Sequence, residues 1–209
     1  MTKRLLIIGA GGHGKVVADT AENMRCWDEI AFLDEQFKQG LTQILHWQVL
    51  GSNEFLSQLN PQNNDVAIGI GNNAIRARVF QDVKRLGFEL PNIIHPSAYI
   101  SLHCQLGIAS VFFAQSVVNI NTKIGNACII NTASSIDHDC QIEDFCHISP
   151  GAHLAGGTTV GTLSWLGIGS CTRQLTQIGS NCVIGAGAAV VQNVYNDSIV
   201  MGVPARLKS

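Results

Sequence analysis

One histidine of this chain stands directly between two carboxylates. Asp137, His138 and Asp139 follow one another in the sequence. Imidazole is the usual proton acceptor near neutral pH, and a carboxylate beside it fixes its tautomer and raises its basicity. The triplet therefore predicts that His138 is a general base and that Asp139 tunes it. The alternative is a turn histidine that is only solvated.

Glycines near the start of the chain are spaced for an anion. Gly9, Gly11 and Gly14 follow an apolar run and precede a helical stretch over 15–24, and an acid follows at Asp34. This spacing satisfies the dinucleotide fingerprint, but the segment has room for only half of the doubly wound fold. Glycines let the backbone approach an anion, and a helix N-terminus offers N–H groups to a phosphate. We predict a nucleotide-diphosphate site, with Asp34 free to accept hydrogen bonds from the ribose or base. The alternative is a glycine turn that only packs a strand on a helix.

A six-residue repeat sets the elements that position His138. From Ile94 to Val190 an apolar residue occupies every sixth position, and only Thr172 departs from the pattern. The position four residues after these, from Ala98 through Ala188, is always Ala, Cys, Ser or Thr. No amphipathic helix has this period, whereas stacked coils of a β-helix do. The C-terminal half is therefore predicted to be a β-helix prism, with His138 near a corner of one coil.

The first ninety residues follow a different pattern. Apolar runs that end at Asp34 and Gly71 alternate with helical stretches over 15–24 and 74–86. Such alternation is typical of a small parallel sheet covered by helices. Because the six-residue register starts at Ile94, we expect a βαβ domain over residues 1–90 and a β-helix domain with a C-terminal tail over 91–209.

Composition excludes several classes of function. The chain has 209 residues and a formal net charge of −2, which gives no electrostatic reason to expect nucleic acid or an anionic membrane. The first apolar run is far shorter than the roughly 18 residues of a membrane-spanning helix, and no secretory pattern follows it. We expect a cytoplasmic protein that does not insert into membranes.

Seven cysteines raise the question of disulfides or a metal, but no Cys-x-x-Cys pair occurs. Five of them occupy the small inward position of the repeat and are interpreted as core residues of a reduced protein. These are Cys104, Cys128, Cys140, Cys146 and Cys182.

Two histidines that follow His138 in the repeat are further candidates. His147 comes nine residues after His138, so it can flank the same groove through its own subunit or across the face of a neighbour. His138, His147 and His153 could also form the three-histidine zinc set of carbonic anhydrase-like prisms. We expect no metal, because those enzymes lack a glycine-loop domain and would leave Asp139 without a role.

Five segments together resemble the PglD/NeuD family of bacterial hexapeptide-repeat sugar acyltransferases, and the resemblance covers essentially the whole chain. The segments are GAGGHGKVV (9–17), FLD (32–34), IGNNAIR (70–76), NTASSIDHDC (131–140) and GVPAR (202–206). The resemblance implies a Rossmann-like half domain followed by a left-handed parallel β-helix. It also implies a homotrimer with active sites between neighbouring prisms, acetyl-coenzyme A as the donor, and a nucleotide-linked sugar held by the N-terminal domain.

The resemblance further assigns roles to individual residues of the β-helix. His138 matches the family's catalytic base and Asp139 the acid that makes it more basic. His147 matches a histidine at the acetyl-coenzyme A site, and Gly156 a glycine whose N–H faces the thioester oxygen. Ile168 and Ala186 match positions whose backbone contacts the pantetheine arm, although the family has glycine where Ala186 stands.

In the N-terminal domain the resemblance implies a second group of contacts. Gly11, Gly12 and His13 match the loop beside the diphosphate and sugar. Asp34 and Glu35 match nucleotide contacts, and Gly71 matches a glycine close to the substrate.

These assignments lead to a predicted reaction, in which His138 takes a proton from a sugar amine as it attacks acetyl-coenzyme A. We rank N-acetylation of a UDP-linked 4-amino-4,6-dideoxy sugar for bacterial surface glycans first. Sialic acid O-acetylation ranks second, and GDP-perosamine N-acetylation is a further alternative. Burial of the prism faces between subunits would explain the exposed apolar residues Phe112, Phe113 and Trp165.

Overall fold

The computed structural model describes residues 3–208, and the chain divides into two compact units. The first unit ends at Pro96 and the second begins at Ser97. Among the described helices, none is long and apolar enough to cross a membrane.

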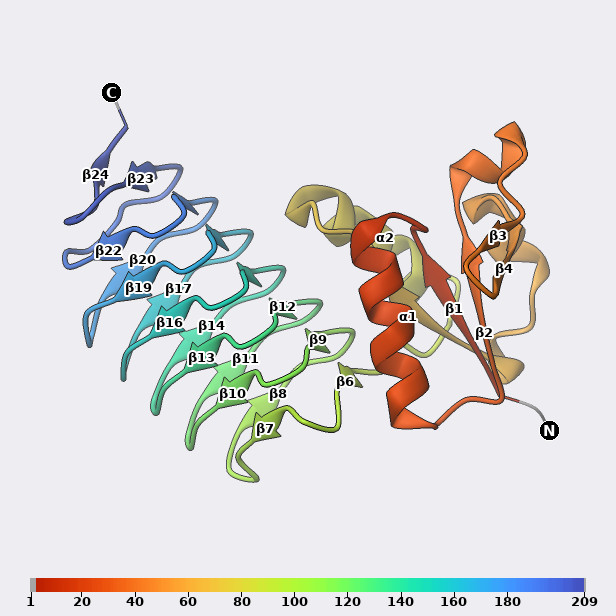
Figure 1. Ribbon diagram of the computed structural model, residues 1–209, viewed down its shortest axis with the longest axis horizontal. Helices are drawn as coiled ribbons and strands as arrows, with labels where there is room; N and C mark the ends of the chain where they lie inside the picture. The colour runs from red at the N-terminus through yellow and green to blue at the C-terminus, as the bar shows by residue number, and fades with distance from the viewer. Residues whose placement is uncertain (1–2, 209) are drawn as a thin grey trace. The chain divides into compact units, whose positions relative to one another are not determined.

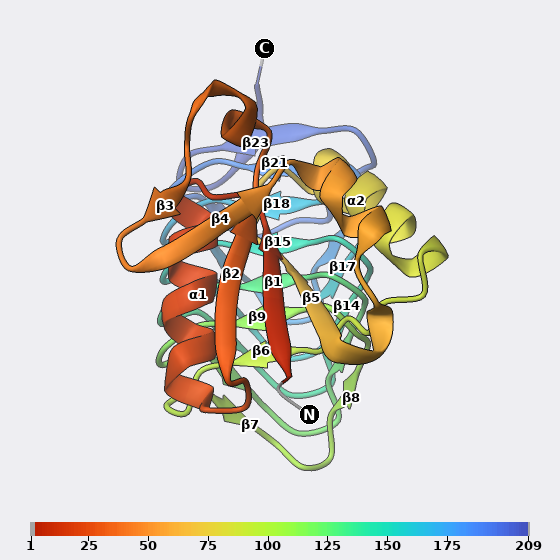
Figure 2. The same ribbon diagram turned by 90° about the vertical axis from the view of Figure 1, so that its right-hand side faces the viewer.

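The first unit is built on a five-stranded sheet in the order β3-β4-β2-β1-β5 (Figure 2). Strand β1 lies between β2 and β5, and its residues Leu5, Leu6 and Ile7 are completely buried. A parallel strand that is covered on both faces requires such a continuous apolar run. The strands are β1 (Arg4–Ile8), β2 (Glu29–Leu33), β3 (Gln43–Ile44), β4 (Trp47–Gly51), β5 (Asn64–Ile68) and, beyond the sheet, β6 (Ile93–Ile94).

Two α-helices accompany this sheet. Helix α1 (Gly12–Met24) packs against β1 and β2, and α2 (Asn73–Arg85) against β5. Helix α1 begins three residues before the predicted start, within the glycine loop itself. Three short 3-10 helices occupy the connections: η1 (Glu35–Gln39), η2 (Asn53–Gln58) and η3 (Pro61–Asn63).

Glycines allow the strand ends and the helix to approach closely. A Cβ at Gly14 would lie 1.9 Å from the carbonyl oxygen of Gly9, and one at Gly69 would lie 2.7 Å from the Gly14 Cα. Any larger residue at Gly14 or Gly69 would separate α1 from the ends of β1 and β5. Part of the fingerprint is therefore structural, as the packing alternative predicted.

The second unit is a left-handed parallel β-helix of stacked coils (Figure 1). Most strand residues pair with the residue eighteen positions later, as Ser135 does with His153, whereas Val183 pairs with Ile199, sixteen positions later. The first face carries β7 (Tyr99–Ile100), β10 (Val117–Val118), β13 (Ser135–Ile136), β16 (His153–Leu154), β19 (Cys171–Thr172) and β22 (Ala189–Val190). The second face carries β8 (Gln105–Leu106), β11 (Lys123–Ile124), β14 (Gln141–Ile142), β17 (Thr159–Val160) and β20 (Gln177–Ile178). The third carries β9 (Val111–Phe112), β12 (Ile129–Ile130), β15 (His147–Ile148), β18 (Trp165–Leu166), β21 (Val183–Ile184), β23 (Ile199–Met201) and β24 (Arg206–Leu207).

The six-residue repeat accounts for this architecture. The large inward residues Ile136, Ile142 and Ile148 are almost completely buried, as are the small inward residues Ser134 and Thr158. Every sixth residue from Ala109 to Gly187 lies in the left-handed region, and at many of these corners it is not glycine. The second residue of each strand and the small residue of each turn therefore fill the prism.

The cysteine interpretation is largely confirmed. Cys128, Cys140, Cys146 and Cys182 are buried, and Cys104 in an early coil is half-buried. The expected exposure of apolar residues was wrong for Phe112 and Phe113, which are buried, and right for Trp165, whose exposed fraction is 47%.

Candidate active site

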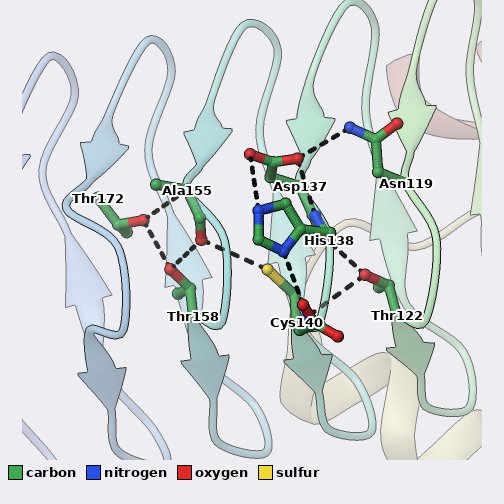
Figure 3. Close-up of polar contacts among 9 residues, drawn as sticks. Asn119, Thr122, Asp137, His138, Cys140, Ala155, Thr158 and Thr172 are labelled. Carbon is green, nitrogen blue, oxygen red and sulfur yellow. Dashed lines mark hydrogen bonds and ion pairs between the residues drawn. The ribbon is translucent and has the colours of Figure 1, made fainter.

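His138 lies at the corner between the first and second faces, in the coil formed by β13 and β14 (Figure 3). Asp139 is the left-handed residue of that corner, with a φ of 60°. Its Oδ2 contacts His138 Nδ1 at 2.7 Å, and its Oδ1 accepts a hydrogen bond of 2.6 Å from Asn121 Nδ2. Asp139 is thus fixed by the preceding coil and in turn fixes the imidazole, whose side chain is 55% exposed.

The charges at this corner favour the protonated form of the histidine. The hydrogen bond that His138 donates to Asp139, followed by the charge of Asp137, raises the pKa of His138 above 6.5. The Asn121 hydrogen bond, followed by that of His138, lowers the pKa of Asp139. A carboxylate that stays ionised beside an imidazole of raised pKa is the arrangement that a general base requires.

Gly156 occupies the same corner one coil later and touches the imidazole. A Cβ at this position would lie 2.6 Å from both Cε1 and Nε2 of His138. The two corners are joined by a 2.9 Å hydrogen bond from Gly157 N to His138 O. Within residues 3–208 the buried Gly156 N–H donates no hydrogen bond. The fold therefore brings together His138, Asp139 and Gly156.

Thr172, the departure from the apolar column, lies beside this turn (Figure 3). Ala155 N donates a 3.0 Å hydrogen bond to Thr172 Oγ1, and Thr158 Oγ1 lies 2.9 Å from the same atom. Strands β16 and β19 pair only through His153 and Cys171, so Thr172, the second residue of β19, is not part of the ladder between them. A side-chain hydroxyl thus holds the residue that precedes Gly156, and the single break in the repeat was the sequence signal for it.

His147 lies on the third face, half a coil away from the His138 corner. Its Nε2 is 3.1 Å from Asn131 Nδ2, and its ring stacks on Trp165 with centroids 5.9 Å apart. Trp165 Nε1 in turn donates a 2.7 Å hydrogen bond to Ser149 Oγ. His147 and His138 of one chain therefore lie on different sides of the prism and do not flank one groove. Asn131, which contacts His147, and Ser149, which accepts from Trp165, were not singled out from the sequence.

Ile168 and Ala186 stack at the corner between the third and first faces. Both are exposed, and Gly187 N donates a 2.8 Å hydrogen bond to Ile168 O. They border the third face, which carries His147 and Trp165, and do not lie at the His138 corner. His153 is on the first face, with Nδ1 2.8 Å from Ser135 Oγ, so the three histidines do not gather within one described chain.

The predicted nucleotide loop shows two kinds of glycine. A Cβ at Gly11, Gly12 or Gly71 would meet no atom within 4 Å, whereas Gly14 and Gly69 are packed against backbone. The glycines assigned to substrate contacts therefore border open space at the start of α1 and after β5.

The expectation that Asp34 is free was wrong. Its Oδ2 accepts a 2.7 Å hydrogen bond from Ala10 N, and its Oδ1 accepts a 2.9 Å hydrogen bond from Gln36 N as it caps η1. Asp34 joins the glycine loop to the end of β2. The neighbouring Glu35 is exposed, forms an ion pair with Lys38, and accepts from Asn53 N.

The same unit contains a histidine with a lowered pKa, His13, and a buried cation, Arg76. Burial, followed by the positive charge of Arg76, lowers the pKa of His13 to about 4. The guanidinium of Arg76 is almost completely buried and donates to Ile70 O, Gly71 O and Asn73 Oδ1 at 2.7 to 3.1 Å. Arg76 was not singled out from the sequence, although it fixes the loop that carries Gly71.

Together, the prism and its histidine corner define the class of β-helix acyltransferases. A family model, the PglD N-terminal domain, matches residues 4–83. The acetyltransferase domain of PglB from Neisseria gonorrhoeae is 40% identical with a TM-score of 0.96, covering 99% of this chain and 100% of that one. PerB from Caulobacter crescentus, solved with CoA and GDP-perosamine, is 33% identical with a TM-score of 0.92, covering 98% and 97%.

A curated relative agrees with these structures. The GDP-perosamine N-acetyltransferase of Escherichia coli O157:H7 is 28% identical over 94% of this chain and 81% of its own length. The present chain belongs to the PglD/NeuD-like family of sugar N-acetyltransferases.

Proposed function

We propose that the protein transfers the acetyl group of acetyl-coenzyme A to the amino group of a nucleotide-linked sugar, with His138 as the general base. The observation that carries this proposal is the corner itself. Asp139 holds His138 Nδ1 at 2.7 Å, and Gly156 touches the opposite, Nε2 side of the ring. The PglB domain of Neisseria gonorrhoeae has been solved with acetyl coenzyme A, which supports the choice of donor.

The geometry supports direct transfer without a covalent intermediate. With Nδ1 committed to Asp139, Nε2 of His138 is the atom that takes a proton from the amine as its nitrogen attacks the thioester carbon. The Gly156 N–H stabilises the oxyanion, and a preorganised donor of this kind contributes about 3 kcal/mol. When the carbon–sulfur bond breaks, the proton on His138 passes to the departing sulfur.

The donor site follows from the half-coil separation described above. His147, Ile168 and Ala186 lie on another side of the prism from His138. A complete site therefore needs the His138 corner of one chain and these three residues of another. We therefore propose a homotrimer in which acetyl-coenzyme A lies between neighbouring prisms.

For the acceptor, we propose a UDP-linked 4-amino-4,6-dideoxy sugar, held by Gly11, Gly12, His13 and Gly71, with Asp34 and Glu35 near the nucleotide. GDP-perosamine is the second candidate, because PerB from Caulobacter crescentus has been solved with it and the Escherichia coli relative is a GDP-perosamine N-acetyltransferase. Sialic acid O-acetylation ranks below both.

The experiment is to incubate the protein with acetyl-coenzyme A and each acceptor in turn, and to follow thiol release. Rapid release with the UDP-linked amino sugar and slow release with GDP-perosamine supports the first choice, and the reverse supports the second. Release only with sialic acid would overturn N-acetylation. A His138→Ala variant serves as the control for background hydrolysis.

A further inference from the structure

Asp137 is the carboxylate on the other side of the His138 ring. Its Oδ1 is occupied, because it accepts from Asn119 Nδ2 at 3.0 Å and from His138 N at 2.8 Å. Its Oδ2 lies 4.0 Å from His138 Nε2 (Figure 3). The triplet therefore presents one carboxylate to each ring nitrogen: Asp139 binds Nδ1, and Asp137 lies beside the nitrogen that exchanges the proton.

A groove opens on this side of the ring. It has a volume of about 360 Å³ and lies on the first face of the prism. Of the triplet, Asp137 lines it, together with Ser135, His153, Ala155 and Thr172. Ala155 and Thr172 are joined by the hydrogen bond that holds the Gly156 turn, so the groove extends from Asp137 to the residue that precedes Gly156.

The acceptor must reach this place with its amino group. A sugar amine has a pKa of about 8, comparable to an α-amino group, so it arrives at pH 7 mainly as an ammonium ion. A hydroxyl acceptor arrives without charge. Both groups can donate a hydrogen bond to a carboxylate, but only the ammonium ion adds the attraction between opposite charges. The Asp137 carboxylate stays ionised, because hydrogen bonds from His138 N and then Asn119 lower its pKa.

We propose that Asp137 Oδ2 binds the ammonium group of the acceptor and thereby selects an amine over a hydroxyl. This inference rests on the proposed function and deepens it, because it assigns N-acetylation over O-acetylation to a particular atom. It also separates the two acids: Asp139 positions the base, whereas Asp137 contacts the substrate.

The protons balance in this scheme. The bound ammonium gives its first proton to His138 Nε2, and His138 releases it to solvent. The neutral amine then attacks the thioester carbon, and the new carbon–nitrogen bond leaves a second excess proton on nitrogen. His138 takes that proton and passes it to sulfur as the carbon–sulfur bond breaks, so the products are an amide, a thiol and one proton in solvent.

The test compares two ligands that differ in one group: the nucleotide amino sugar that the wild-type protein acetylates, and the same molecule with a hydroxyl in place of the amine. Calorimetric dissociation constants are measured at pH 7 for the wild type and for Asp137→Asn, which can still accept from Asn119 and His138 N. Asp197→Asn is the matched control, since Asp197 also accepts from a corner asparagine, in a later coil.

We expect the wild type and Asp197→Asn to prefer the amine by 10- to 100-fold, on the order of a charge-assisted contact. Asp137→Asn should bind both ligands within about twofold of each other, and Asp137→Glu should regain part of the preference. The KM for acetyl-coenzyme A should not change. A merely structural role for Asp137 would weaken both ligands equally.

Two contrary outcomes are distinguishable. If the wild type acetylates the amino sugar and Asp137→Asn retains the full preference for the amine, the role of Asp137 is wrong and the proposed function stands. If the wild type releases no thiol with any amino sugar, the proposed function fails and this inference fails with it.

Discussion

Replacing Gly156 by alanine should displace the base without unfolding the prism. The new Cβ would lie 2.6 Å from His138 Cε1 and Nε2, so the ring must retreat by about 0.8 Å to reach ordinary contact at 3.4 Å. The ring can retreat because its side chain is more than half exposed. A misplacement of about 1 Å costs on the order of 10²-fold in rate, and the Gly156 N–H itself is retained in alanine.

We therefore expect kcat/KM of Gly156→Ala to fall by about 10²-fold while the midpoint of thermal unfolding changes little. The sharper assay is a double-mutant cycle with His138→Ala, measured by thiol release. If alanine acts by moving the imidazole, it should cost almost nothing in the His138→Ala background. Equal losses in both backgrounds, or wild-type turnover of Gly156→Ala, would refute the reasoning.

Three further predictions concern charge. Because the pKa of His138 is raised above 6.5 and the base must be neutral, kcat/KM should fall as the pH drops through that pKa. Asp139→Asn removes the main cause of the raised pKa, so this decrease in kcat/KM should occur at lower pH. His13, with its pKa lowered to about 4, should show no imidazole titration by NMR between pH 5.5 and 8. Since an unfolded histidine binds its proton near 6.5, this group makes the fold less stable as the pH falls from 6.5 towards 4. Arg76→Ala leaves three carbonyl-type acceptors without their donor, so urea unfolding should show a loss of about 3 kcal/mol and the KM for the nucleotide sugar should rise.

The six-residue repeat was sufficient to predict the β-helix, because its period dictates which residues face inward. It also predicted the His138 corner, since Asp137, His138 and Asp139 are adjacent in the chain. Thr172 marked a local departure that the structure explains by its hydrogen bond to Ala155 N.

Other features depend on contacts that spacing does not encode. Asp34 follows a strand as expected, but only the fold brings Ala10 N to its carboxylate. Arg76 lies four residues before Phe80 and seven before Val83, which are buried, so its helical spacing places it on the buried face of α2. Its charge argued for the surface instead, and only the fold supplies the loop acceptors that compensate for burial. The separation of nine positions between His138 and His147 is compatible with one groove if only the sequence is considered. In the structure the coil has eighteen residues, so the two histidines lie on different sides of the prism.

The measurement that tests the central claim most directly is thiol release from acetyl-coenzyme A with the preferred nucleotide amino sugar, by the wild type and by His138→Ala. The account predicts a folded variant with the wild-type unfolding midpoint and a kcat/KM lower by about 10²- to 10⁴-fold. A folded His138→Ala variant that acetylates the amino sugar at the wild-type rate would contradict it.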